Sequence, residues 1–214
     1  MKNTVICIFG SSIMEGIIEM NDPKERWYEI LRASLRDKFP DTCFSIINSA
    51  IGGQSTRECM ERFDCDVLSH NPDYLIVMCA GNNDDYARPE RIVSHEEFEE
   101  LNENMLSRLP AKTKVIAVGL GPIINELHWT YTHPLFMEIF KKLGKGLDES
   151  IEWERESFRQ FAKSRNLPFY DLYRAFEKEP QKYLLPDGVH LNTTGNKVFG
   201  ESIFNMMKDI VEEK

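Results

Sequence analysis

The sequence has 214 residues, of which 42% are hydrophobic and 29% are charged. A chain of this length can bury one substantial core, so we expect a single domain over residues 1–214. The formal net charge of −9 argues against nucleic-acid binding, which depends on basic patches that neutralise phosphates. The same charge balance disfavours an electrostatic anchor to an anionic membrane.

The apolar run over residues 5–9 is too short for the core of a signal peptide, and no stretch approaches the roughly 20 apolar residues that span a bilayer. The five cysteines include no CxxC pair, which disfavours a disulfide framework or a zinc site. Cys7, Cys43 and Cys79 lie in apolar runs, where a reduced cysteine packs as a small hydrophobe. We therefore expect a cytoplasmic protein with free thiols.

In the first part of the chain, short apolar runs alternate with amphipathic stretches. The run over 5–9 predicts a strand buried on both faces. Asp22 followed by Pro23 predicts the start of a helix, as its N-cap and its first helical residue. A second buried strand is predicted over 44–47, and apolar residues at helical spacing predict a helix over 56–68.

The alternation continues through the rest of the chain. Buried strands are predicted over 74–79 and 114–119, and a capping box at Ser94 predicts a helix between them. Amphipathic spacing predicts helices over 149–163 and 196–211.

A weaker strand is predicted over 167–170. Strand–helix alternation of this kind indicates a five-stranded, mostly parallel sheet with helices on both faces. Ligands of such sheets bind at the carboxyl ends of the strands, so the residues that follow each run are the candidates for a site.

Four polar segments lie at these positions or before the last helix, and they are GSSIMEG at 10–16, NSAIGGQS at 48–55, GNND at 81–84 and DGVHLN at 187–192. In this order they resemble the conserved blocks of the GDSL, or SGNH, hydrolase family, from Phe9 to Asn192. The resemblance implies a flavodoxin-like three-layer α/β/α sandwich. No G-x-S-x-G surrounds Ser12, which argues against an α/β-hydrolase.

Residue by residue, the resemblance implies that Ser12 is the nucleophile and that Asp187 and His190 are its acid–base pair. Gly53 and Asn83 match the oxyanion-hole glycine and asparagine of the family, and the Ser12 backbone N–H completes that set. The family usually has aspartate before the nucleophile, whereas this sequence has Ser11. The nucleophile is retained, and we expect the difference to alter either the contacts that hold the loop or the local charge.

The chemistry also follows from the residue types. A serine hydroxyl becomes nucleophilic when a histidine removes its proton, and an acid on the other ring nitrogen fixes the histidine tautomer. The oxygen that turns negative during ester attack needs preplaced donors. Such a triad needs no cofactor, and no histidine pair has zinc-ligand spacing with an acidic partner. We expect a small-molecule ester substrate, and we favour a small acyl group such as acetyl on a carbohydrate, because the family includes carbohydrate acetylesterases.

Each motif alone has a simpler interpretation. Ser11 and Ser12 can cap a helix or bind a phosphate, the glycines at 52 and 53 can form a turn, and His190 can be structural. Two other functions use the same fold, an acyltransferase and a non-catalytic binding module, and Ser11 motivates the latter. The aromatic segment at 128–134 is equally consistent with a substrate-lining loop and with a packed surface loop or a subunit contact. The oligomeric state is left open.

Overall fold

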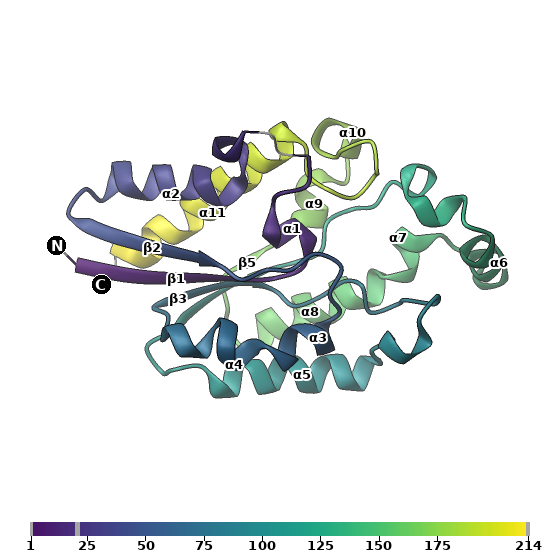
Figure 1. Ribbon diagram of the computed structural model, residues 1–214, viewed down its shortest axis with the longest axis horizontal. Coiled ribbons are helices and arrows are strands. Elements are labelled where there is room, and N and C mark those ends of the chain that lie inside the picture. The colour runs from purple at the N-terminus through teal and green to yellow at the C-terminus, as the bar shows by residue number, and fades with distance from the viewer. Residues whose placement is uncertain (1, 20–21, 213–214) are drawn as a thin grey trace.

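The computed structural model describes residues 2–19 and 22–212, and its core is one five-stranded sheet (Figure 1). The strand order is β2-β1-β3-β4-β5, and every neighbouring pair is parallel. This is the order of flavodoxin-like doubly wound sheets, and the predicted fold class is confirmed. The strands are β1 (Lys2–Gly10), β2 (Thr42–Asn48), β3 (Tyr74–Met78), β4 (Lys114–Val118) and β5 (Phe169–Tyr170).

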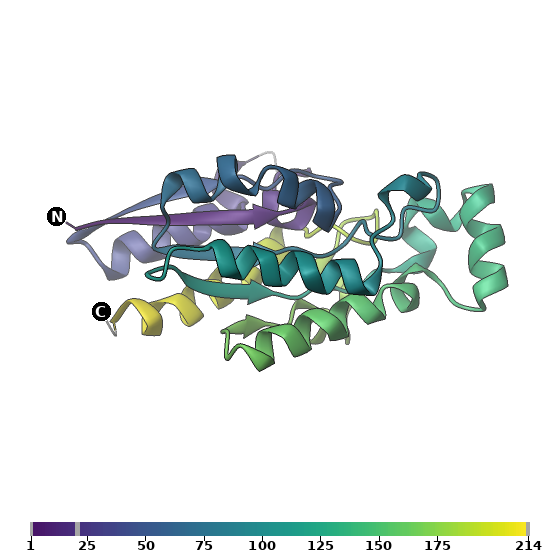
Figure 2. The same cartoon turned by 90° about the horizontal axis from the view of Figure 1, so that it is seen from below.

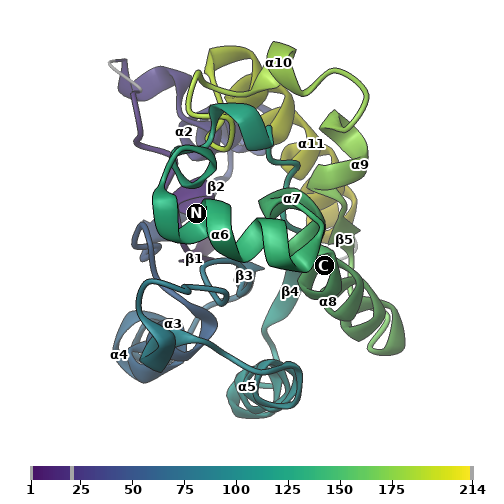
Figure 3. The same cartoon turned by 90° about the vertical axis from the view of Figure 1, so that its right-hand side faces the viewer.

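Helices cover both faces of the sheet (Figures 1 and 3). On one face lie α2 (Trp27–Lys38) and α11 (Thr193–Glu212), which pack against each other. On the other face lie α3 (Thr56–Glu61), α4 (Phe63–Asp66) and α5 (His95–Arg108), and α8 (Glu152–Ser164) packs beside α5. The short helices are α1 (Ser12–Glu15), α6 (Pro134–Leu143), α7 (Leu147–Ser150), α9 (Leu172–Phe176) and α10 (Pro180–Tyr183), and the 3-10 turns are η1 (Pro23–Glu25), η2 (Leu68–His70), η3 (Pro89–Arg91), η4 (Asn125–Leu127) and η5 (Trp129–Tyr131).

Strand β1 lies near the centre of the sheet and is buried on both faces. Ile6 and Ile8 point into the core beneath α2 and α11, whereas Cys7 and Phe9 point into the core beneath α3 and α4. All four side chains are fully buried. Burying an isoleucine contributes about 1.5–3 kcal/mol, so β1 is firmly held, and the residues at its carboxyl end have a rigid support.

Strand β2 behaves differently, because it is the edge strand of the sheet. Its residues are only partly buried, so the expectation that 44–47 is buried on both faces is wrong. Cys43 is exposed, and its predicted packing as a small hydrophobe is wrong as well, whereas Cys7 and Cys79 are buried. An edge strand has a sheet neighbour on one side only, and this leaves side chains near its start in contact with solvent.

Three predicted helices have different boundaries in the structure. Asp22 caps the 3-10 turn η1, and α2 begins only at Trp27. The helix predicted over 56–68 divides at Arg62 into α3 and α4, and the helix predicted from residue 149 divides at Ile151 into α7 and α8. Ser94 caps α5 as predicted, since its side chain accepts a hydrogen bond from the Glu97 N–H.

The segment from η4 to α6 was not predicted as helical. Helix α6 stands beyond the carboxyl ends of the strands, at the right of Figure 1 and again at the right when the molecule is seen from below in Figure 2. Seen along the strands, it lies in front of them (Figure 3). Within residues 2–19 and 22–212, none of the helices has the length and apolar character required to cross a bilayer.

Candidate active site

Ser12 is placed by a tight turn between β1 and α1. Gly10 has φ of +144°, and a Cβ there would lie 2.6 Å from the Met78 carbonyl oxygen. Only glycine fits this position, because a side chain would collide with the β3 backbone. Ser11 is buried and its side chain makes no capping hydrogen bond. The turn therefore presents Ser12 at the carboxyl edge of the sheet, where a ligand is expected.

His190 and Asp187 lie on the loop between α10 and α11. The Asp187 Oδ1 atom accepts hydrogen bonds from the backbone N–H groups of Val189 and His190, both at 3.0 Å. Gly188 has φ of +76°, and a Cβ there would lie 2.6 Å from the Ile124 carbonyl oxygen. The loop is thus a locally closed unit that requires glycine at its tip.

The structure brings these two residues to Ser12. His190 Nε2 lies 2.8 Å from Ser12 Oγ, and His190 Nδ1 lies 2.6 Å from Asp187 Oδ2. Burial disfavours the ionised form of Asp187, but its backbone hydrogen bonds and the His190 ring outweigh that effect and lower the pKa of this carboxyl. An ionised carboxylate on Nδ1 leaves Nε2 free to accept the Ser12 proton.

The Gly52–Gly53 turn lies beside the nucleophile. A Cβ on Gly52 would be 3.5 Å from the Ser12 Cβ, and the Gly52 N–H donates to Glu15 Oε2 at 3.0 Å. Gly53 has φ of +75°, and no heavy atom lies within 4 Å of its Cβ position. Within the described residues, neither the Ser12 nor the Gly53 N–H has an acceptor. Both are available to a ligand at this edge.

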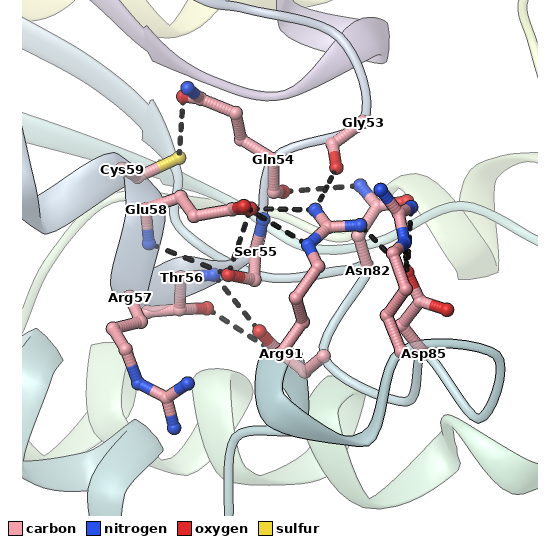
Figure 4. Close-up of polar contacts among 12 residues, drawn as sticks. Gly53, Gln54, Ser55, Thr56, Arg57, Glu58, Cys59, Asn82, Asp85 and Arg91 are labelled. Atoms are coloured by element: carbon pink, nitrogen blue, oxygen red, sulfur yellow. Dashed lines mark hydrogen bonds and ion pairs between the residues drawn. The ribbon is translucent and has the colours of Figure 1, made fainter.

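Arg91 clamps the Gly53 turn from outside (Figure 4). Its Nη2 donates to the Gly53 carbonyl oxygen at 2.5 Å and to Glu58 Oε2 at 2.6 Å, and its Nε donates to Glu58 Oε1 at 3.0 Å. Its Nη1 donates to Asp85 Oδ2 at 2.7 Å. The Arg91 guanidinium lowers the pKa of Glu58 to about 2. This clamp could not be predicted from the sequence, because its members come from three separate segments.

Asn83 is fully buried, and its side chain is completely engaged. Its Oδ1 accepts from the Thr56 N–H at 2.9 Å, and its Nδ2 donates to Thr56 Oγ1 at 3.0 Å and to Glu154 Oε2 at 2.8 Å. An amide nitrogen carries two hydrogens, so both are used in this conformation.

A small crevice adjoins Ser12 and His190. It is lined by Ile13, Ile18 and Leu191, among others, and has a volume of about 10 Å³. This is room for a group about the size of one water molecule. A much larger cavity of about 470 Å³ lies between η5, α6 and α7, and its lining includes Tyr131, Phe140, Lys141 and Lys145.

The aromatic segment at 128–134 follows a residue, Ile124, that is hydrogen-bonded to the His190 loop. The Ile124 N–H donates to the Gly188 carbonyl oxygen at 2.8 Å. Burial lowers the pKa of His128, and the charges of Asp187 and His190 also act on it. Next to it, the Trp129 side chain is 58% exposed and packs edge-on against Phe136 at 5.0 Å. A large exposed ring therefore lies next to His128 in this segment.

Two histidines outside the site are exposed. They are His70 and His95, and His95 stacks on Trp153 at 3.9 Å. Asn192 caps α11, since its Oδ1 accepts from the Gly195 N–H at 2.9 Å. In the part of the chain that the structure describes, no group of three His, Cys, Asp or Glu side chains is arranged to hold a metal ion.

Fold and site together give a doubly wound α/β/α protein with a candidate catalytic triad at the carboxyl edge of its parallel sheet. Residues 8–198 match the GDSL-like Lipase/Acylhydrolase family, and the chain belongs to this family. As a member, it is a carboxylic ester hydrolase, as the sequence motifs predicted.

Individual relatives are distant. A GDSL esterase/lipase, WDL1, of Oryza sativa subsp. japonica is 24% identical over 212 residues, which cover 94% of this chain and 76% of the relative. The lipase/acylhydrolase structure from Enterococcus faecalis superposes with a TM-score of 0.72 at 20% identity, over 96% of both chains. An acetyl xylan esterase structure from Geobacillus stearothermophilus has a TM-score of 0.69 at 17% identity, over 94% of this chain and 93% of that one. At these identities the structures support the fold alone.

Proposed function

We propose that this protein hydrolyses a carboxylic ester through an acyl-enzyme on Ser12. The observation that carries the proposal is the chain of contacts from Ser12 Oγ through the His190 ring to Asp187, at 2.8 Å and 2.6 Å. Both distances lie within hydrogen-bond reach, which proton transfer requires. We assign Ser12 as nucleophile, His190 as general base and acid, and Asp187 as the group that orients the imidazole.

The first half of the reaction acylates the enzyme. Ser12 Oγ attacks the carbonyl carbon of the ester while its proton passes to His190 Nε2. The former carbonyl oxygen becomes negative and accepts hydrogen bonds from the Ser12 and Gly53 N–H groups, which have no other acceptor among the described residues. The intermediate then collapses, the bond to the alcohol oxygen breaks, and His190 returns its proton to the departing alcohol.

The second half releases the acid. A water molecule loses a proton to His190 Nε2 and attacks the acyl carbon, the bond to Ser12 Oγ breaks, and the proton returns to the serine. Asp187 stabilises the imidazolium in both halves, because its carboxylate accepts from Nδ1. The same residues would transfer the acyl group to a sugar if an alcohol replaced the water.

We further propose that the acyl group is small, such as acetyl, and that a carbohydrate carries it. The crevice next to Ser12, of about 10 Å³, suits a methyl group better than a long chain. Similar structures include two acetyl xylan esterases, one of them from Geobacillus stearothermophilus, and the exposed Trp129 ring offers a flat surface of the kind that sugars stack on.

A comparison of hydrolysis rates on different ester substrates tests this proposal. Acetate release from acetylated xylo-oligosaccharide and hydrolysis of p-nitrophenyl esters of increasing chain length are measured, with Ser12→Ala as the blank. The proposal predicts that the acetyl esters are cleaved fastest and that Ser12→Ala is inactive on all of them. Rapid cleavage of long-chain esters with slow cleavage of acetyl esters would contradict the small acyl group.

We also propose a cytoplasmic location. All five cysteines lie among the described residues and are free thiols, which suits a reducing compartment. Cell fractionation followed by immunodetection tests this, and recovery of the protein outside the cytoplasm would contradict it.

A further inference from the structure

The cavity between η5, α6 and α7 has a volume of about 470 Å³, and the proposed reaction does not use it. Cavities of roughly 300–1,000 Å³ are typical of small-molecule sites, which combine apolar and aromatic walls with a few polar groups. The walls of this cavity include Tyr131, Phe140 and Leu147 together with charged side chains. Tyr131 is 50% exposed, so its ring is open to a ligand that enters the cavity.

Two lysines line this cavity, although the net charge of the chain is −9. Lys141 lies in the last turn of α6, and Lys145 follows Gly144, which ends that helix with φ of +68°. The helix dipole favours a cation in the last turn, which explains Lys141 within the fold, whereas Lys145 lies beyond that turn. Within residues 2–19 and 22–212, neither lysine forms an ion pair with an acidic side chain. Both ammonium groups are therefore available to an anionic ligand.

The other charged groups around the cavity limit the charge of that ligand. Lys142 pairs with Glu138 at 2.7 Å and is not part of the lining. Glu126 lines the cavity with Lys141 and Lys145, so two ammonium groups and one carboxylate leave one net positive charge. That charge matches a single carboxylate, whereas a phosphate group carries about −1.5 to −2 at neutral pH.

The cavity wall is joined to two segments at the carboxyl edge of the sheet. Asn125 lines the cavity and follows Ile124, whose N–H donates to the Gly188 carbonyl oxygen in the His190 loop at 2.8 Å. Phe140 lines the cavity from α6 and packs edge-on against Tyr86, in the segment after β3, with ring centroids 6.5 Å apart. The cavity therefore belongs to the end of the molecule that carries the candidate triad.

We propose that this cavity is a subsite for a sugar residue that carries a carboxylate, such as a uronic acid, within the acetylated carbohydrate substrate. The inference rests on the function proposed above and narrows its substrate class. Lys141 and Lys145 attract the carboxylate as point charges, and the Tyr131 ring packs against the sugar. The acetylated residue of the same oligosaccharide lies at Ser12. Because the two lysines are not part of the triad, they affect substrate binding and not the chemical step.

Matched substrates with and without a carboxylate test the subsite. Acetate release is measured on an acetylated xylo-oligosaccharide and on the same oligosaccharide with a glucuronic acid substituent. For the wild type at low salt, we expect KM on the acidic substrate to be at least about threefold lower than on the neutral one. Most of this difference should disappear in about 0.5 M salt, because salt screens exposed charges. Equal KM values at low salt would overturn the inference.

Lysine substitutions locate the preference within the molecule. A variant with both Lys141→Gln and Lys145→Gln should have KM on the acidic substrate raised about three- to tenfold, so that the two KM values agree within about twofold. Lys142→Gln is the matched control, because Lys142 carries the same charge and lies outside the cavity lining. It should retain the preference of the wild type. A preference that persists in the double variant, or that is lost in Lys142→Gln, would overturn the inference.

A binding measurement separates failure of this inference from failure of the proposed function. Calorimetry follows binding of the deacetylated acidic oligosaccharide to the wild type and to the double lysine variant. Tighter binding to the wild type supports the subsite whether or not the protein hydrolyses esters, and equal binding to both proteins would overturn it. Absence of p-nitrophenyl acetate hydrolysis by the wild type would instead contradict the proposed function.

Discussion

Replacement of Arg91 by methionine tests whether the Gly53 turn needs its outer clamp. The substitution removes the bond to the Gly53 carbonyl oxygen at 2.5 Å and leaves Glu58 and Asp85 without their shared cation. The Asp85 side chain is 13% exposed and that of Glu58 is 33% exposed. Breaking a buried ion pair costs about 3–5 kcal/mol, and partial exposure reduces this to about 2–3 kcal/mol here.

For a chain of this size, such a loss lowers the melting temperature by roughly 5–10 °C. Release of the Gly53 carbonyl lets the neighbouring N–H drift from the oxyanion, for which we expect about a 10- to 100-fold fall in kcat. Thermal unfolding and p-nitrophenyl acetate kinetics below the unfolding range measure the two effects separately.

Arg88→Met is the matched control. Arg88 also bonds to Asp85 Oδ2, at 2.8 Å, but its side chain is 61% exposed and does not contact Gly53. The Arg88→Met substitution should lower the free energy of unfolding by less than about 0.5 kcal/mol and leave kcat unchanged. Equal effects of the two substitutions, or an unchanged kcat in Arg91→Met, would refute the reasoning.

Three further predictions concern other parts of the site. Gly188→Ala should lose about 1–3 kcal/mol of stability and most of its esterase activity, because residue 188 has φ of +76° and a Cβ would press on the Ile124 carbonyl oxygen; chemical denaturation measures the loss, and full activity would contradict the loop geometry. In the folded state the pKa of Glu58 is lowered to about 2, so its contribution to stability is complete above the unfolded pKa of about 4.5 and is lost as pH falls through 2. The stability of Glu58→Gln should therefore depend less steeply on pH in acid than that of the wild type. Identical acid-unfolding curves would count against the ion pair. Trp129→Ala should lower kcat/KM on acetylated xylo-oligosaccharide by about three- to tenfold through KM and leave kinetics on p-nitrophenyl acetate unaffected. Met137→Ala, at a similarly exposed residue, is the control, and an unchanged KM in Trp129→Ala would exclude stacking on this ring.

The main features of the sheet could be predicted from sequence because its central strands are continuous apolar runs. Ser12, Asp187 and His190 were predicted from the resemblance of short polar segments to the family blocks, and the structure brings these three side chains together. The edge position of β2 could not be predicted, since strand order depends on tertiary packing, and Cys43 is exposed for that reason.

Two other features that could not be predicted share one physical origin. In each, a charged side chain turns inward and hydrogen-bonds to backbone that is distant in the sequence. Arg62 ends α3 early, and its guanidinium bonds to the Gln54 side chain and to the Gly10 carbonyl oxygen, which amphipathic spacing does not encode. Glu154 belongs to a helix whose pattern assigns most acidic residues to solvent, and only the packing of α8 against the Gly81 turn buries it.

The most direct test of the central claim is p-nitrophenyl acetate hydrolysis by the wild type and Ser12→Ala over a pH series, with fluorophosphonate labelling of both. The account predicts that the wild type is active and is labelled at Ser12, and that the variant loses both properties. Retained activity in Ser12→Ala, or labelling at another residue of an active wild type, would contradict the assignment of Ser12 as the nucleophile.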